Sequence, residues 1–187
     1  MTSWVILDRD GVINADSDHF IRNLDEWRPL PGSIDAIARL CRAGFRVAVA
    51  TNQSGVGRGL IAPEALAAIH RELKRLVVIA GGGIAGIFFC PHLPEDGCDC
   101  RKPRPGLLHS IAARFAIDLT GVPAVGDSLR DLEAALAMGC APILVRTGNG
   151  RATERALASH PDARLHRVLI LDDLAAAADF LITERSS

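Results

Sequence analysis

The sequence predicts an α/β fold with a doubly wound, Rossmann-like parallel sheet, and two observations carry this prediction. Short runs rich in Val and Ile alternate along the chain with longer amphipathic stretches. The short runs show no alternation of apolar and polar residues, as expected for strands that helices cover on both faces. Strands and helices in turn imply right-handed crossover connections, and therefore a mostly parallel sheet.

The first five elements follow this rule in order. A strand is predicted at Trp4–Leu7, where apolar residues precede an aspartate, and a helix at Ser33–Ala43, where apolar residues recur every three to four positions before a glycine. The next strand, Arg46–Ala50, leads to a helix at Pro63–Ala80, which opens with proline and glutamate. Three glycines then turn the chain into the strand Gly86–Phe89.

The second half of the chain repeats this pattern. A helix at Leu107–Ile117 precedes a strand at Val122–Val125, and a further helix, Leu129–Met138, ends before a glycine that suits its cap. The remaining elements are a strand at Ala141–Val145, a short helix at Arg151–Ser159, a strand at Val168–Leu171 and a helix at Leu174–Ile182. Two segments lack a regular pattern. Asn14–Pro31 is predicted to form a flap, and Gly55–Gly59 a flexible turn, because it lacks the spacing of a nucleotide-binding loop.

The bulk composition excludes several classes of protein. With 187 residues, 49% of them apolar and 23% charged, the chain is expected to form one globular domain over residues 1–187. A net charge of −1, aromatic residues at only 4% and the lack of tyrosine argue against a nucleic-acid partner. We expect a monomer.

The N-terminal residues and the longest uncharged stretch argue against export and membrane insertion. The opening MTSWVILD has no basic region, and its apolar run ends at Asp8. The stretch Leu76–Pro91 is shorter than the ~18–20 residues that span a bilayer, and glycines interrupt it. The sequence therefore predicts a cytoplasmic protein with no membrane partner. Thiols stay reduced in that compartment, so clustered cysteines there more often bind metal than form disulfides.

Polar residues follow four of the predicted strands. Because parallel strands present their carboxyl ends at one edge of the sheet, where ligands bind, these residues are expected to lie together. They are Asp8 and Asp10 after the first strand, Thr51, Asn52 and Gln53 after the second, Arg101 and Lys102 after the third, and Asp127, Ser128 and Asp131 after the fourth. Two interpretations of Asp131 stay open: an ordinary carboxylate in the first turn of a helix, or support for a metal site.

These residue types together suit phosphoryl transfer. The carboxylates of Asp8 and Asp127 are ligands that Mg²⁺ prefers beside phosphate. A carboxylate can also attack phosphorus, which makes Asp8 the candidate nucleophile. Asp10, two residues further on, is placed to protonate the leaving oxygen and later to activate water. The Lys102 ammonium and the Thr51 hydroxyl would hold the phosphoryl oxygens.

A second constellation lies in the stretch CPHLPEDGCDCRKP. Cys90, His92, Cys98 and Cys100 supply three thiolates and one imidazole, which is a full tetrahedral set for Zn²⁺. A disulfide between the last two cysteines would close a strained ring. Four protein ligands leave no open position on the metal, so the predicted zinc is structural. It would order an irregular loop and position Arg101 and the lysine that follows it.

The chain resembles the haloacid dehalogenase superfamily of phosphotransferases. DRDGV, TNQSG, Lys102 and GDSLRD match the four motifs of that superfamily in order, within a resemblance that runs from Ile6 to about Gly150. The resemblance implies the catalytic roles given above, and it adds the backbone carbonyl of Asp10 to the Mg²⁺ ligands. Several members carry lysine where this chain has Ser128, so a substrate contact at that position is not carried over.

Within the superfamily, two groups carry such a zinc loop. The chain looks most like the D-glycero-D-manno-heptose-1,7-bisphosphate 7-phosphatases, through ILDRDGVIN, ATNQSGVGRG, CDCRKPRPGLL and VRTGNG. This resemblance implies a phosphorylated sugar substrate. No cap domain is expected, because both points where members of the superfamily usually carry one are short here. The resemblance also implies substrate contacts at Asp16, Ser17, Asp18, His19, Asn52, Gln53, Ser54 and Arg101. Histidinol-phosphate phosphatase is the alternative. A non-catalytic zinc-bearing binding module is a third hypothesis, which the acid/base pair disfavours.

Overall fold

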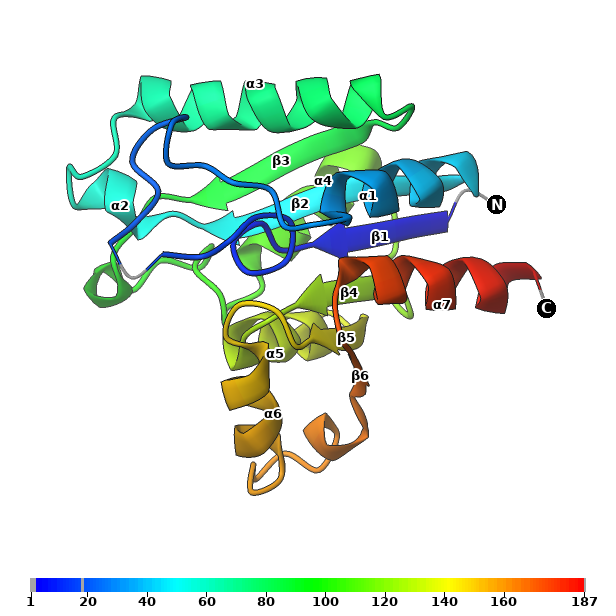
Figure 1. Cartoon of the computed structure of the whole chain (residues 1–187). Coiled ribbons are helices and arrows are strands. Elements are labelled where there is room, and N and C mark those ends of the chain that lie inside the picture. The colour runs from blue at the N-terminus through cyan, green and yellow to red at the C-terminus, as the bar shows by residue number, and fades with distance from the viewer. Residues whose placement is uncertain (1–2, 18, 187) are drawn as a thin grey trace.

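In the computed structural model, one parallel sheet of six strands forms the centre of the molecule, in the order β3-β2-β1-β4-β5-β6 (Figure 1). The structure describes residues 3–17 and 19–186. The strands are β1 (Ser3–Leu7), β2 (Phe45–Asn52), β3 (Ile84–Cys90), β4 (Pro123–Gly126), β5 (Ala141–Val145) and β6 (Leu169–Leu171). Every neighbouring pair runs parallel, which confirms the predicted doubly wound sheet.

Helices cover both faces of this sheet. They are α1 (Ser33–Arg42), α2 (Ser54–Gly57), α3 (Pro63–Ile79), α4 (Gly106–Phe115), α5 (Leu129–Ala137), α6 (Gly150–Leu157) and α7 (Leu174–Ser186), with short 3₁₀ turns at Pro94–Asp96 and Leu165–Arg167. Figure 1 shows α1 and α7 side by side in front of the sheet, with α4 and α5 behind it. No helix among residues 3–17 and 19–186 combines the length and apolar character needed to cross a membrane.

The central strand β1 shows why the predicted strands lack polar alternation. Val5 and Leu7 are fully buried in the core on the α1, α3 and α7 face. Trp4 and Ile6 point the other way, into the core beside α4. Successive strand residues face opposite sides of the sheet, so a strand between two helical layers must be apolar throughout.

Two features of β2 and its loop differ from the prediction. The strand continues to Asn52, two residues beyond the predicted end, and it pairs with β3 to its last residue. The following glycines do not form a flexible turn, because Ser54–Gly57 is a single helical turn. A Cβ on Gly55 would lie 2.5 Å from Ile61, and one on Gly57 would lie 2.5 Å from a backbone oxygen of Pro91. Both positions are therefore occupied by glycine because a side chain there would clash with packed neighbours, and not because the turn needs to be flexible.

The predicted flap is a loop that folds back on itself. Ala15 donates a backbone hydrogen bond to Arg28, and Leu30 donates one to Ile13, so both ends of the loop are fixed beside β1. Figure 1 shows the loop, in blue, running past the carboxyl ends of the strands toward α2. Phe20 reaches the helical turn there, because a Cβ on Gly55 would lie 3.1 Å from its ring.

Candidate active site

A cavity of about 170 Å³ opens at the carboxyl ends of β1, β2 and β4. It brings together all five residues predicted to handle the phosphoryl group: Asp8, Asp10, Thr51, Lys102 and Asp127. Six of the eight predicted substrate contacts also line it: Asp16, Ser17, Asn52, Gln53, Ser54 and Arg101. His19 is exposed and is not one of the lining residues. Asp18 falls outside the described residues.

Asp8 lies at the bottom of this cavity, directly after β1. Its backbone N–H donates to Val125 on the neighbouring strand β4 at 2.9 Å, which fixes the residue to the sheet. One carboxylate oxygen accepts a hydrogen bond from Lys102 Nζ at 2.9 Å. Burial raises the pKa of Asp8 to about 8, against the opposing charge of Lys102, and the neighbouring carboxylates add to this rise. The site is therefore short of positive charge around its candidate nucleophile.

Lys102 is almost completely buried and is held at both ends of its side chain. Its Nζ donates to Ala50 O at 2.8 Å and forms an ion pair with Asp131 at 2.5 Å, besides the contact with Asp8. Although burial alone would lower the pKa of Lys102, the charges of Asp131 and Asp8 raise it. The backbone of Lys102 exchanges two hydrogen bonds with the Asn52 amide, each 3.1 Å long. Asn52 thus holds the lysine loop against β2.

The sequence left two interpretations of Asp131 open, and the structure shows which groups its carboxylate contacts. Its second carboxylate oxygen accepts hydrogen bonds from the Ser128 hydroxyl at 2.6 Å and from the Ser128 backbone N–H at 3.0 Å. The carboxylate therefore caps the start of α5 and pairs with Lys102 at once. Ser128 therefore has a contact within the protein, because its hydroxyl donates a hydrogen bond to Asp131.

Asp10 is surrounded by protein hydrogen-bond donors. The Arg9 guanidinium donates to both of its oxygens, at 2.8 and 3.0 Å, and Asn14 donates to one of them at 2.8 Å. Gln53 donates to the other at 2.6 Å and also contacts the Thr51 hydroxyl at 3.0 Å. Gln53 thus links the candidate acid/base to the candidate phosphate-holding hydroxyl.

Sequence reasoning missed two residues behind Asp10. Arg9 is only 1% exposed, and its Nη1 lies 3.3 Å from Nε2 of His70 on α3. Since arginine can only donate, this contact requires a neutral His70 with Nε2 as the acceptor. Burial, helped by the charge of Arg9, lowers the pKa of His70 to about 4, which keeps the ring neutral. The DRDG motif contained Arg9, but no local pattern in α3 indicated His70.

Asp127 lies in a tight backbone cradle. A Cβ on Gly11 would lie 2.1 Å from its carboxylate, and one on Gly148 would lie 2.2 Å from it. The backbone N–H of Asn149 donates to Oδ2 at 2.7 Å. Burial raises the pKa of Asp127 to about 7, and the charge of Asp131 adds to this rise. Gly11 and Gly148 therefore leave free the space that the Asp127 carboxylate occupies.

These acidic groups form one candidate metal site. Asp8, Asp127 and Asp131 each offer a carboxylate oxygen, and the three oxygens lie within 4.8 Å of one another. Asp131 already uses both of its oxygens, one on Lys102 and the other on Ser128, whereas Lys102 engages one oxygen of Asp8. Asp8 and Asp127 are therefore the carboxylates that we expect to bind a hard cation. The raised pKa values of both groups fit this chemistry, because a bound cation would supply the missing positive charge.

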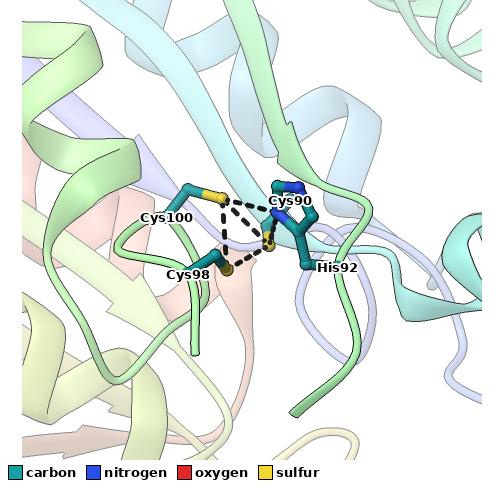
Figure 2. A group of neighbouring side chains, drawn as sticks. All are labelled: Cys90, His92, Cys98 and Cys100. Carbon is teal, nitrogen blue, oxygen red and sulfur yellow. Dashed lines mark hydrogen bonds between the residues drawn. The ribbon is translucent and has the colours of Figure 1, made fainter. Parts of the chain in front are cut away.

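The Cys/His group forms a second candidate metal site, at the end of β3 (Figure 2). The Sγ atom of Cys100 lies 3.1 Å from Cys90 Sγ and 3.5 Å from Cys98 Sγ, and His92 Nδ1 lies 3.2 Å from Cys100. A disulfide would bring two sulfurs to about 2 Å, whereas ligands of a tetrahedral Zn²⁺ lie about 3–4 Å apart. Figure 2 shows the four side chains converging on one point. Their geometry fits a closed zinc site.

The order in which this sheet delivers its polar groups is that of the haloacid dehalogenase-like hydrolases, and this is the class that the fold and the site define. A model of the family described as "HAD-hyrolase-like" matches residues 99–177. Over the described residues, neither the flap nor the zinc loop contains a cap domain.

Comparison with known proteins narrows this class. The chain is 54% identical to the D-glycero-beta-D-manno-heptose-1,7-bisphosphate 7-phosphatase of Bordetella bronchiseptica, over 96% of this chain and 98% of that protein. It is 54% identical to the enzyme of the same name from Pseudomonas aeruginosa, with the same coverage. The crystal structure of the B. bronchiseptica enzyme, complexed with magnesium and phosphate, superposes with a TM-score of 0.91 at 53% identity, covering 97% of this chain and 99% of that one.

The chain belongs to this family of haloacid dehalogenase-like phosphatases, which are phosphoric monoester hydrolases. Similarity extends to the Burkholderia thailandensis D,D-heptose 1,7-bisphosphate phosphatase, at 44% identity and a TM-score of 0.72, covering 96% of this chain and 98% of that chain.

Proposed function

We propose that this enzyme removes the C7 phosphate of D-glycero-β-D-manno-heptose 1,7-bisphosphate through an aspartyl-phosphate intermediate. The observation that carries the proposal is the Asp8–Lys102–Asp131 chain of contacts at the bottom of the cavity. It places a nucleophile and a buried cation together where a phosphoryl group would lie. The names of relatives 54% identical over 96% of the chain support the substrate.

Mg²⁺ is the proposed catalytic cofactor. Asp8, Asp127 and the backbone carbonyl of Asp10 would hold it, and the glycine cradle around Asp127 fits this role. When bound, it supplies positive charge to the phosphoryl oxygens and to the Asp8 carboxylate. A structural neighbour complexed with magnesium and phosphate supports the same assignment.

The proposed chemistry has two displacements at phosphorus. In the first, a carboxylate oxygen of Asp8 attacks, the bond from phosphorus to the C7 oxygen breaks, and Asp10 gives that oxygen a proton. In the second, Asp10 takes a proton from water, the water oxygen attacks phosphorus, and the bond to Asp8 breaks. Lys102 and Thr51 hold the phosphoryl oxygens in both steps, where charge must be stabilised.

Zn²⁺ is the proposed occupant of the Cys/His site, with a structural role. Arg101 Nη1 donates to the backbone oxygen of His92 at 3.3 Å, so the ligand loop directly positions that arginine. Lys102 follows two residues after the ligand Cys100. Because zinc requires thiolates, a reducing cytoplasmic location belongs to this proposal. The single domain over residues 1–187 and the monomeric state remain predictions.

A substrate panel tests the proposed function. Phosphate release with Mg²⁺ is measured for the heptose 1,7-bisphosphate and for histidinol phosphate, and ³¹P NMR identifies which phosphate leaves. We expect kcat/KM for the bisphosphate to exceed that for histidinol phosphate at least ~100-fold, with heptose 1-phosphate as the product. Comparable efficiencies, or preferred loss of the C1 phosphate, would contradict the assignment.

Asp8→Asn provides the chemical control in the same panel. The amide cannot attack phosphorus, so turnover should fall at least ~10³-fold while the fold persists. Asp25→Asn, at an exposed position on the flap, is the matched control and should keep full activity. A folded Asp8→Asn enzyme with near-normal turnover would show that another residue is the nucleophile.

A further inference from the structure

The rim of the active-site cavity carries two arginines that form no ion pair with the carboxylates that the structure describes. Four cationic side chains line the cavity, and two of them are ion-paired: Arg9 with Asp10, and Lys102 with Asp8 and Asp131. The other two, Arg101 and Arg130, form no ion pair with a carboxylate that the structure describes. Arg101 is half-buried, and Arg130 is exposed in the first turn of α5.

Two observations place these two arginines at the same part of the rim. Both arginines line the active-site cavity, and both line a second cavity beside the zinc loop, so they stand where the two meet. Burial lowers the pKa of Arg101, and the charge of Arg130 is the next cause. Arg130 also acts on the charge of Asp16 across the rim, but Asp16 hydrogen-bonds instead to Asn149 at 3.2 Å.

This arrangement costs free energy without a ligand. Two like charges repel, and a cation in the first turn of a helix also opposes the positive end of the helix dipole. An anion between the two side chains would reverse both effects. Guanidinium groups suit a phosphate well, because each offers a planar fork of N–H donors. Only one of the Arg101 donors is engaged among the described residues, with His92 O.

The two arginines lie at a different depth in the cavity from the site at Asp8 where the phosphoryl group would be transferred, which is called the transfer site below. Lys102 and Thr51 are 4% and 1% exposed and surround the bottom of the cavity beside Asp8. Arg101 and Arg130 lie further out, toward solvent. A substrate with one phosphate at Asp8 and a second phosphate at the other end of its carbon chain would reach both places.

We propose that Arg130 joins Arg101, which is already expected to contact the substrate, in binding the second, non-transferring phosphate of a sugar bisphosphate, and that Arg130 is therefore a specificity-determining residue. This inference rests on the proposed function. It gives Arg130 a role in selecting doubly phosphorylated substrates, and it gives the zinc loop an indirect role, because that loop holds Arg101.

The test compares substrates with and without the distal phosphate. kcat/KM is measured for the heptose 1,7-bisphosphate and for heptose 7-phosphate, in the wild type, Arg130→Ala and Arg155→Ala. Arg155 is an exposed arginine on α6, so its variant removes the same charge from outside the cavity. The ratio compared is kcat/KM for the bisphosphate divided by kcat/KM for heptose 7-phosphate. We expect Arg130→Ala to lower this ratio at least ~10-fold, mainly by raising KM for the bisphosphate, whereas Arg155→Ala leaves it as in the wild type.

Inhibition separates the two phosphate positions. Heptose 1-phosphate should inhibit Arg130→Ala at least ~10-fold more weakly than the wild type, while inorganic phosphate, which fits the transfer site, should inhibit both equally. If the wild type does not release the C7 phosphate, the proposed function fails. If it does, but Arg130→Ala leaves the efficiency ratio unchanged or weakens both inhibitors equally, the inference about Arg130 is wrong.

Discussion

At the scale of single residues, the candidate acid/base Asp10 depends on a chain of contacts that begins outside the cavity lining, at His70. Both oxygens of Asp10 accept hydrogen bonds from Arg9, and Arg9 in turn has His70 as a neighbour. His70 is a positioning residue in this chain of contacts, because its Nε2 gives the buried guanidinium an acceptor. An arginine without it would leave a donor unpaired in the core, which costs about 1–3 kcal/mol.

His70→Leu should therefore lower kcat about tenfold with little change in KM, because Arg9 loses the contact that fixes Asp10. His70→Gln offers an acceptor oxygen on a side chain of similar reach and should restore most of the activity. Steady-state kinetics on both variants, with thermal unfolding as the measure of folding, checks this. Equal activity in the two folded variants would show that packing, rather than the acceptor, is what matters at this position.

At the scale of elements, the loop between β3 and α4 joins the candidate zinc ligands to the candidate phosphate-holding lysine. It contains few regular elements, yet it supplies Arg101 and the buried Lys102. Two contacts hold it from outside: Asn52 exchanges hydrogen bonds with the Lys102 backbone, and Gly106 approaches Asp99 so closely that a Cβ would lie 2.4 Å from its carbonyl oxygen. The Cys/His group closes the remaining part of the loop.

Cys98→Ser should remove the tightly bound metal and lower both stability and activity, because the energy of zinc binding is folding energy for this loop. Elemental analysis of the wild type should find one zinc per chain, retained after mild EDTA treatment that removes Mg²⁺. Cys41→Ser, outside the cluster, is the control and should keep its zinc. Fully active protein without zinc would contradict the structural role of the metal.

At the scale of the whole molecule, the burial of two carboxylates in the site makes stability depend on pH. Burial raises the pKa of Asp8 to about 8 and that of Asp127 to about 7, above the usual value near 4. Between these values the folded protein binds protons that the unfolded chain releases. These two groups therefore make the free energy of unfolding of Mg²⁺-free protein fall as the pH rises from about 4 to about 8. Their effect outweighs that of His70, whose lowered pKa of about 4 acts in the opposite direction below the usual histidine value.

Thermal unfolding without Mg²⁺ should accordingly give a lower Tm at pH 8 than at pH 5. Added Mg²⁺ should raise Tm more at pH 8, where the carboxylates ionise readily to bind it. Asp127→Asn removes one of the two groups and should reduce the difference in Tm between the two pH values. A wild-type Tm that is equal at both pH values, or a variant with an undiminished difference, would contradict this explanation.

Much of this architecture could be predicted from the sequence because its signals are local. Apolar runs and helical periods located all six strands, and the topology of a parallel sheet then required the residues after those strands to meet at one edge. The grouping of the four Cys/His side chains was equally evident, since all four lie within one short stretch. Local signals failed at Gly55 and Gly57, whose close contacts with Ile61 and Pro91 come from packing.

The sequence by itself determined which chemical groups the protein brings to its site and the order in which strands deliver them. Only the tertiary structure decided which of those groups contact one another. It directs Asn52 to the Lys102 backbone, pairs Asp131 with the Lys102 ammonium, and places Arg130 in the lining of the same cavity as Arg101. The physical reason is that strand periodicity specifies positions along the chain, whereas the direction of a side chain depends on neighbours from distant segments.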